Sequence, residues 1–161
     1  MNRKEFITYY QEICQPMVTL MKMAPKDNLD WKPLPNTWNL GQVLQHCAGT
    51  PQMFVIAIKN TWPSQEELQK MFTNSLSNPQ MSGEEAAAAF ESNKAKVIEE
   101  LSKVSDSDFL NKQMDTIFVK GSLSKVLQHF ATDHQNNHKH QLFTYLKLLG
   151  APVNTMTLYR G

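Results

Sequence analysis

The chain has 161 residues, 41% hydrophobic and 19% charged, a composition typical of a single globular domain over residues 1–161. Its net charge of +1 lacks the basic excess of nucleic-acid-binding proteins, so we expect no nucleic-acid partner. No apolar run of about 18 residues and no signal-peptide segment is present, and Cys14 and Cys47 are too few for a disulfide framework, so we expect a cytoplasmic protein without membrane association.

Four long segments carry the three- and four-residue hydrophobic spacing of amphipathic helices. These segments are residues 3–23, 39–60, 82–104 and 122–149. Asn39 followed by Gln42, and Ser82 followed by Glu85, are capping boxes that mark two of the helix starts. Pro16 lies inside the first segment and is expected to kink it, because proline removes an intrahelical hydrogen bond.

The connections between these helices carry weaker patterns. We expect a short helix in residues 61–72, a loop at 73–81, an irregular stretch over 105–120 with a short extended piece at 115–119, and a surface tail at 153–161. Four long helices with almost no strand pattern predict an all-α fold. The predicted architecture is a four-helix bundle with a short extra helix between the second and third long helices.

The motif Val-Leu-Gln-His occurs twice, at residues 43–46 and 126–129. The likeness extends over 39–49 and 122–132, which share six residues in register. We attribute it to a shared helix cap and apolar stripe, because the first and third long helices show no matching similarity. Helical phase must therefore decide whether the two motif histidines have the same role.

The fourth long helix holds four of the five histidines. With about 100° of rotation per residue, His134 and His138 fall in the middle of its apolar stripe, one turn apart. His129 and His140 fall at the border of the polar arc. That polar arc is expected to contain Lys125, Gln128, Thr132, Gln135 and Lys139. We therefore expect only one pair of histidines from this helix to point into the bundle.

Two inward imidazoles at positions i and i+4 can bind one cation. A third ligand must come from another helix, where His46 is the only histidine and lies within a wide apolar arc. The sequence therefore predicts a three-histidine site of His46, His134 and His138 for a divalent ion, with zinc or nickel best suited to neutral imidazoles. The alternative is a metal-free bundle in which each ring is hydrogen-bonded to core side chains or water.

Two stretches, PNTWNLGQVLQHCAG and DHQNNHKHQLFTYLKLLGAP, resemble the DinB/YfiT-like superfamily of bacterial four-helix bundles. The resemblance covers nearly the whole chain and implies an up-down-down-up bundle, a metal held by His46, His134 and His138, and a homodimer. It also implies a metal-dependent hydrolase or a thiol S-transferase. The chain departs from the family pattern at Asn137, Lys139 and His140, which leaves neighbouring contacts and the substrate open.

We accordingly expect a divalent-metal-dependent enzyme for a small-molecule substrate, in which the ion activates water or a low-molecular-weight thiol. Thr50 and Gln141 are candidates to orient the bound group, and no general base is identified. The alternative is a non-catalytic metal- or ligand-binding bundle for sensing, storage or partner docking. A fourth protein ligand, such as His140 or Cys47, would favour that alternative.

The three tryptophans lie where loops meet helices. We expect them to pin loops onto the bundle and not to stack on a ligand. They are Trp31, Trp38 and Trp62.

Overall fold

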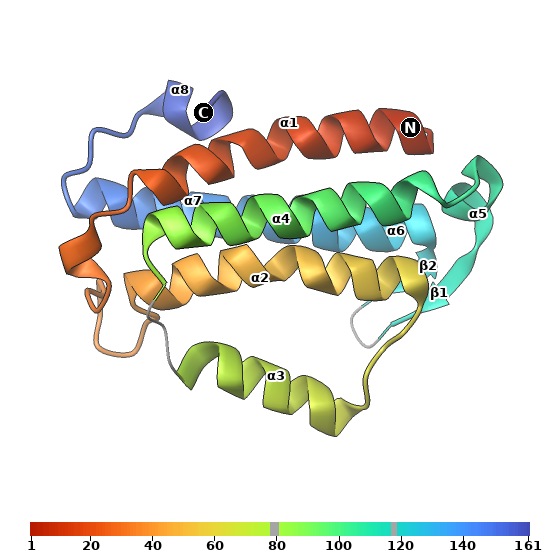
Figure 1. Cartoon of the computed structure of the whole chain (residues 1–161), viewed down its shortest axis with the longest axis horizontal. Helices are drawn as coiled ribbons and strands as arrows, with labels where there is room; N and C mark the ends of the chain where they lie inside the picture. The colour runs from red at the N-terminus through yellow and green to blue at the C-terminus, as the bar shows by residue number, and fades with distance from the viewer. Residues whose placement is uncertain (78–80, 117–118) are drawn as a thin grey trace.

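The structure, a computed structural model, describes residues 1–77, 81–116 and 119–161. Four long helical rods form a bundle (Figure 1). The rods are α1 (Arg3–Lys22), α2 (Leu40–Lys59), α4 (Gly83–Ser102) and a C-terminal rod made of α6 (Leu123–Leu127), a π-helical segment (Gln128–His134) and α7 (Gln135–Leu148). α1 and the C-terminal rod run in one direction and α2 and α4 in the other, which is the up-down-down-up order (Figure 1). The predicted all-α bundle is confirmed.

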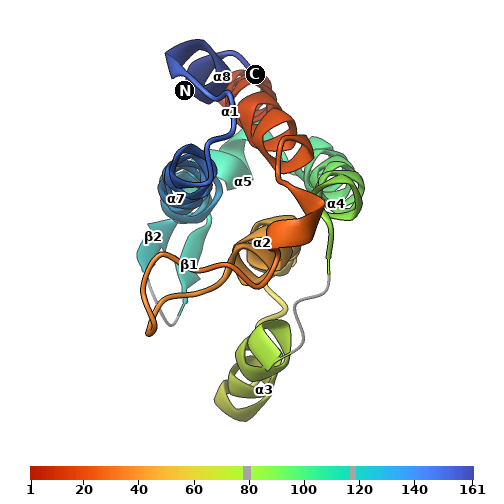
Figure 2. The same cartoon turned by 90° about the vertical axis from the view of Figure 1, so that its left-hand side faces the viewer.

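Shorter elements connect and cover these rods. They are the 3₁₀ turn η1 (Lys26–Asn28), α3 (Gln65–Ser77), α5 (Asp106–Asn111), the antiparallel strands β1 (Gln113–Asp115) and β2 (Lys120–Ser122), and α8 (Thr155–Tyr159). α3 lies outside the bundle against α2 and carries the chain back along it, so that α4 can run parallel to α2 (Figures 1 and 2). The predicted extra helix between the second and third long helices is confirmed.

Side-chain caps begin the long helices where the sequence predicts them. In α2, Gln42 N donates to Asn39 Oδ1 and Asn39 N donates to Gln42 Oε1, both at 2.8 Å. Ser82 and Glu85 form the corresponding box at α4, and Ser122 caps α6. These bonds satisfy backbone donors that a helix start leaves without partners, so they fix the residue at which each rod begins.

The core lies where the four rods face one another, with α2 and α7 as neighbours on one side of the bundle (Figure 2). Phe54 of α2 is fully buried and packs edge-on against Tyr10 of α1, with ring centroids 6.1 Å apart. Asn93 of α4 donates a buried hydrogen bond of 2.9 Å to the Ala48 carbonyl of α2. Among the described helices, none is long and apolar enough to cross a membrane.

Several expectations for the connections are wrong. The loop expected at 73–81 is helical as far as Ser77, the last residue of α3. Polar residues do not by themselves end a helix, and the first proline after the start of α3, Pro79, comes two residues beyond Ser77 in the sequence. The stretch 105–120 contains α5, capped by Ser105, and a two-stranded hairpin. The expected extended piece at 115–119 includes residues 117–118, which lie outside the described residues. The tail forms α8, which Asn154 caps, and most of its residues are exposed, as a surface tail should be.

The predicted polar arc of the C-terminal rod is wrong beyond Gln128. Thr132, Gln135 and Lys139 are only 0%, 1% and 5% exposed. The cause is the π-helical segment, because an i→i+5 turn contains one residue more than an α turn and shifts later residues by about 100°. Thr132 favours this wide turn, since its hydroxyl donates to the Gln128 carbonyl at 2.5 Å and competes with the helical N–H.

Candidate metal centre

Three histidine side chains from two rods meet at the interface of α2 with the C-terminal rod. His46 Nε2 lies 3.2 Å from His134 Nε2 and 3.0 Å from His138 Nε2. The three rings are half-buried. The π-helical shift moves His134 and His138 from the middle of the buried stripe to its edge beside α2, which is where they reach His46. The structure thus brings together the three residues that the sequence predicts as one site.

Two neighbouring side chains hold the His138 ring. Gln141, one turn later on α7, accepts a hydrogen bond through Oε1 from His138 Nδ1 at 2.9 Å. Trp38 lies parallel to the His138 ring, with centroids 6.0 Å apart and an interplanar angle of 7°. Trp38 also packs against the His46 ring, with ring centroids 5.0 Å apart. The backbone carbonyl of Trp38 accepts a hydrogen bond from Tyr145 Oη at 2.9 Å. The ring of His138 is therefore fixed by an amide on one side and an indole on another.

The family model for the DinB family matches residues 1–160. The chain belongs to the DinB family. Its fold is similar to that of a DinB-like protein from Bacillus cereus ATCC 10987, with a TM-score of 0.77, 18% identity and coverage of 96% of this chain and 98% of that one. The DinB-like protein YjoA from Bacillus subtilis matches with a TM-score of 0.69, 18% identity and coverage of 92% and 94%. Among curated proteins, none matches the sequence significantly.

Protons alone cannot satisfy the three imidazoles of this DinB family member. Because His138 donates through Nδ1 to Gln141, its neutral Nε2 carries a lone pair. If His46 Nε2 is protonated, it can donate to only one of its two neighbours and cannot accept from the other. If it is unprotonated, two lone pairs face each other 3.0 Å apart, at His46 and His138. In either tautomer one close contact is unmet, which disfavours the metal-free alternative.

The spacing of the nitrogens fits a shared divalent ion. Two nitrogens bound to one zinc at about 2.0–2.1 Å lie roughly 2.8–3.4 Å apart for angles between about 90° and 109°. The observed separations of 3.0 and 3.2 Å fall in this range. The ligand atoms of all three histidines lie within 4.8 Å of one another, so a single cation could accept their lone pairs and these residues fit a metal ligand set.

The local environment keeps the three rings neutral, as metal ligands must be. Burial, with the neighbouring imidazoles His138 and His134, lowers the pKa of His46 from 6.5 to about 3. Burial and the rings of His138 and His129 lower the pKa of His134 to about 4. Burial also lowers the pKa of His138, and its bond to Gln141 opposes this shift. The lone pairs are therefore available near neutral pH.

Neither expected candidate supplies a fourth ligand. His140 is exposed and donates through Nδ1 to the Asn136 carbonyl at 2.8 Å. Cys47 is fully buried in the core, and burial raises the pKa of its thiol to about 12. In the described parts of the chain, the histidine, cysteine and carboxylate groups close enough to share one ion with this cluster are limited to its three histidines. His129 is exposed on the C-terminal rod, so the two motif histidines are not equivalent.

The sequence interpretation missed the part played by Trp38. Its indole contacts the rings of His46 and His138, in addition to its place at the loop–helix junction. The available signal was its position directly before Asn39, the cap of the helix that carries His46. The Thr50 hydroxyl donates to the His46 carbonyl at 2.7 Å and keeps its oxygen lone pairs as acceptors. Gln141 accepts the hydrogen bond from His138 Nδ1 described above.

Replacement Gln141→Leu is expected to weaken metal affinity by roughly 10- to 100-fold, the usual effect of losing an outer partner of a ligating histidine. The change removes the acceptor that holds His138 with its proton on Nδ1. Competition with a chromogenic chelator measures the affinity. Gln141→Glu retains an acceptor at this position and should restore most of it. Equal affinities for Gln141→Leu and wild type would refute the positioning role.

The metal-free protein is expected to lose stability as pH falls from about 6.5 towards 4. An unfolded chain protonates its histidines below 6.5, whereas folded His46 and His134 take up protons only near 3 and 4. The unfolded state then binds more protons, so acid favours it. Urea unfolding of chelator-treated protein between pH 7 and 5, above the main carboxylate range, measures how the free energy of unfolding changes with pH. His46→Ala should give a shallower slope, and identical slopes would contradict this explanation.

Proposed function

We propose that this DinB family member is a divalent-metal-dependent enzyme that acts on a small molecule, with water or a low-molecular-weight thiol as the nucleophile. His46, His134 and His138 would hold the ion. The observation that carries the proposal is the convergence of their three Nε2 atoms in a cluster that no arrangement of protons satisfies. The family membership supports it at the level of the fold.

The residues present define what each would contribute. Zinc or nickel would suit three neutral imidazoles, and such a ligand set leaves positions open for substrate. A bound divalent ion would supply Lewis acidity and lower the pKa of water or of a thiol towards neutrality. Gln141 would keep His138 in the tautomer that directs its lone pair to the centre. Trp38 would shield two of the rings from solvent on one side.

One observation favours the alternative of a non-catalytic metal- or ligand-binding bundle. No carboxylate joins the histidine cluster within the described residues, and Thr50 and Gln141, which hydrogen-bond to the His46 carbonyl and to His138, carry a neutral hydroxyl and a neutral amide. A general base is therefore missing from the residues around the cluster. A thiol, with a pKa near 8.5, needs less help than water to lose its proton, so the thiol route depends least on such a base.

Activity with and without metal tests the proposal. Chelator-treated protein is reloaded with zinc or nickel and assayed in two arms, hydrolysis of p-nitrophenyl esters and conjugation of cysteine or glutathione to monochlorobimane. We expect a metal-dependent rate in at least one arm, lost in His134→Ala and kept in His129→Ala. Stoichiometric metal binding without metal-dependent turnover in either arm would reject the enzyme and favour the binding module.

A further inference from the structure

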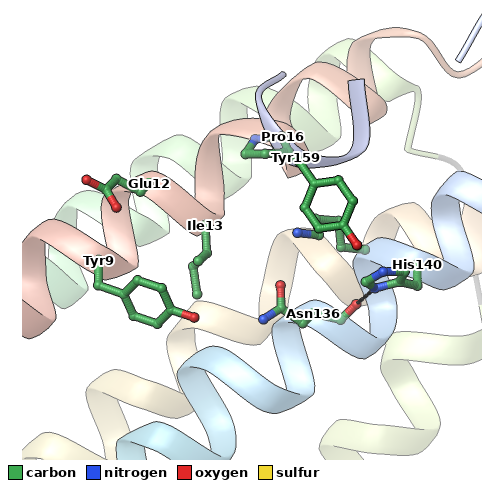
Figure 3. A pocket seen from close by; sticks show the side chains of 8 residues that line it. Tyr9, Glu12, Ile13, Pro16, Asn136, His140 and Tyr159 are labelled. Atoms are coloured by element: carbon green, nitrogen blue, oxygen red, sulfur yellow. Dashed lines mark hydrogen bonds between the residues drawn. The ribbon is translucent and has the colours of Figure 1, made fainter. Parts of the chain in front are cut away.

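A hollow lies between α1, α7 and α8, apart from the histidine cluster. Its volume is about 370 Å³, and Tyr9 and Ile13 of α1, Asn136 and Lys139 of α7 and Tyr159 of α8 line it (Figure 3). We call it the Lys139 pocket. The histidines of the metal centre are not among its lining residues, so the pocket is a separate site.

The distinctive group in this pocket is a buried lysine without a counter-ion. Lys139 is only 5% exposed, and lysines buried to this degree are almost always paired. Its Nζ lies over the Tyr159 ring, 5.6 Å from the centroid. No carboxylate of the described chain lies within ion-pair distance of it. Glu12 also lines the hollow, and its carboxylate is turned away from the other labelled side chains (Figure 3).

Further hydrogen-bond donors surround the hollow. The Tyr9 hydroxyl and the Asn136 side-chain amide have no protein partner within the described residues, and both belong to the pocket wall (Figure 3). His140 is already committed, because its Nδ1 donates to the Asn136 carbonyl at 2.8 Å. Ile13 and the ring face of Tyr159 add apolar wall. Apart from Glu12, the pocket thus combines one cation, neutral donors and aromatic or aliphatic surface.

We propose that the Lys139 pocket binds a small organic monocarboxylate with an apolar or aromatic body. The carboxylate would lie against the Lys139 ammonium and accept from Tyr9 or Asn136, and the body would rest against Ile13 and Tyr159. A single cation favours one negative charge over the nearly two that phosphate carries at neutral pH. The volume is ample for a molecule of the size of a benzoate.

Isothermal titration calorimetry of the full chain with benzoate at neutral pH tests this proposal. We expect saturable one-to-one binding in the millimolar range or tighter, weakened about tenfold or more in Lys139→Met, because a hydrogen bond to a charged donor is lost. Lys147→Met is the matched control, since Lys147 lies on the same helix with Nζ 5.6 Å from the Phe143 ring centroid but is exposed. It should bind benzoate as wild type does. Neutral benzamide should not bind.

Two further variants keep the test decisive. Tyr159 is 62% exposed, so Tyr159→Leu should fold and bind benzoate several-fold more weakly. His134→Ala should bind it unchanged; loss of binding in His134→Ala with retention in Lys139→Met would place the carboxylate at the histidine cluster and overturn the proposal. Absence of saturable benzoate binding to wild type, or tighter binding of inorganic phosphate than of benzoate, would overturn it as well.

Discussion

Added zinc or nickel is expected to raise the melting temperature of the wild-type protein and to leave that of His46→Ala nearly unchanged. His46 Nε2 is the nitrogen that contacts both other rings, so its removal breaks both short contacts of the cluster. An ion that binds only the folded state at a thousandfold excess over Kd stabilises it by about 4 kcal/mol. For a chain of this length that corresponds to roughly 8–16 °C. Differential scanning calorimetry measures the shift.

The histidine of the second Val-Leu-Gln-His motif provides the control variant for this result. His129→Ala removes the histidine of the second Val-Leu-Gln-His stretch, which is exposed and outside the cluster. Its melting temperature should respond to the metal as wild type does. A full shift in His46→Ala, or the same loss in both variants, would contradict the assignment of the three-histidine site.

The replacement Phe54→Ala is expected to destabilise the fold by about 3–5 kcal/mol, the usual cost of truncating a buried phenylalanine. Phe54 is fully buried where α2 faces α1, and its loss leaves a cavity beside the Tyr10 ring. Urea unfolding followed by circular dichroism measures the change. Leu148→Ala, at a position 60% exposed, should change stability by less than about 1 kcal/mol.

A loss of below about 2 kcal/mol in Phe54→Ala would show that this region of the core repacks around the truncation. Metal stoichiometry should stay unchanged in its folded fraction, because the Phe54 ring packs against Tyr10 and is not part of the histidine cluster. A variant that is fully folded but without metal would show that this core position affects the metal site, and would contradict the expected unchanged stoichiometry.

Local chemistry explains why most of the fold could be predicted from the sequence. The caps at Asn39, Ser82 and Ser122 act through hydrogen bonds to residues three positions later, so the letters alone identify them. Hydrophobic spacing then identifies the buried faces of the rods. Short elements such as α5 and α8 were not predicted, because a single helical turn has too few residues for a periodic pattern.

The phase of the C-terminal rod could be predicted only as far as the π-helical segment. A phase calculation assumes a constant rotation per residue, and one wide turn displaces every later residue. A constant rotation therefore places Gln135 and Lys139 on the solvent face, although they are buried. His134 and His138 were found nonetheless, because the shift moved them from the middle of the stripe to the edge that faces His46.

The partners of the site could be predicted less well than its histidines. The sequence predicts that Gln141 lies near the site, but its bond to His138 Nδ1 depends on side-chain rotamers. Trp38 reaches the rings across the helix start, a contact that sequence spacing does not encode. Lys139 is buried because the helical phase is displaced and because Tyr159 of α8 lies against it. The amino-acid sequence predicts neither feature.

Elemental analysis of untagged protein, purified without chelators, tests the central claim most directly. We predict one divalent ion per chain in wild type and in His129→Ala, and a strong loss of that ion in folded His134→Ala. His134 belongs to the cluster, and His129 lies outside it on the same rod. Wild-type protein without stoichiometric metal, or His134→Ala that retains as much metal as wild type, would contradict the three-histidine site.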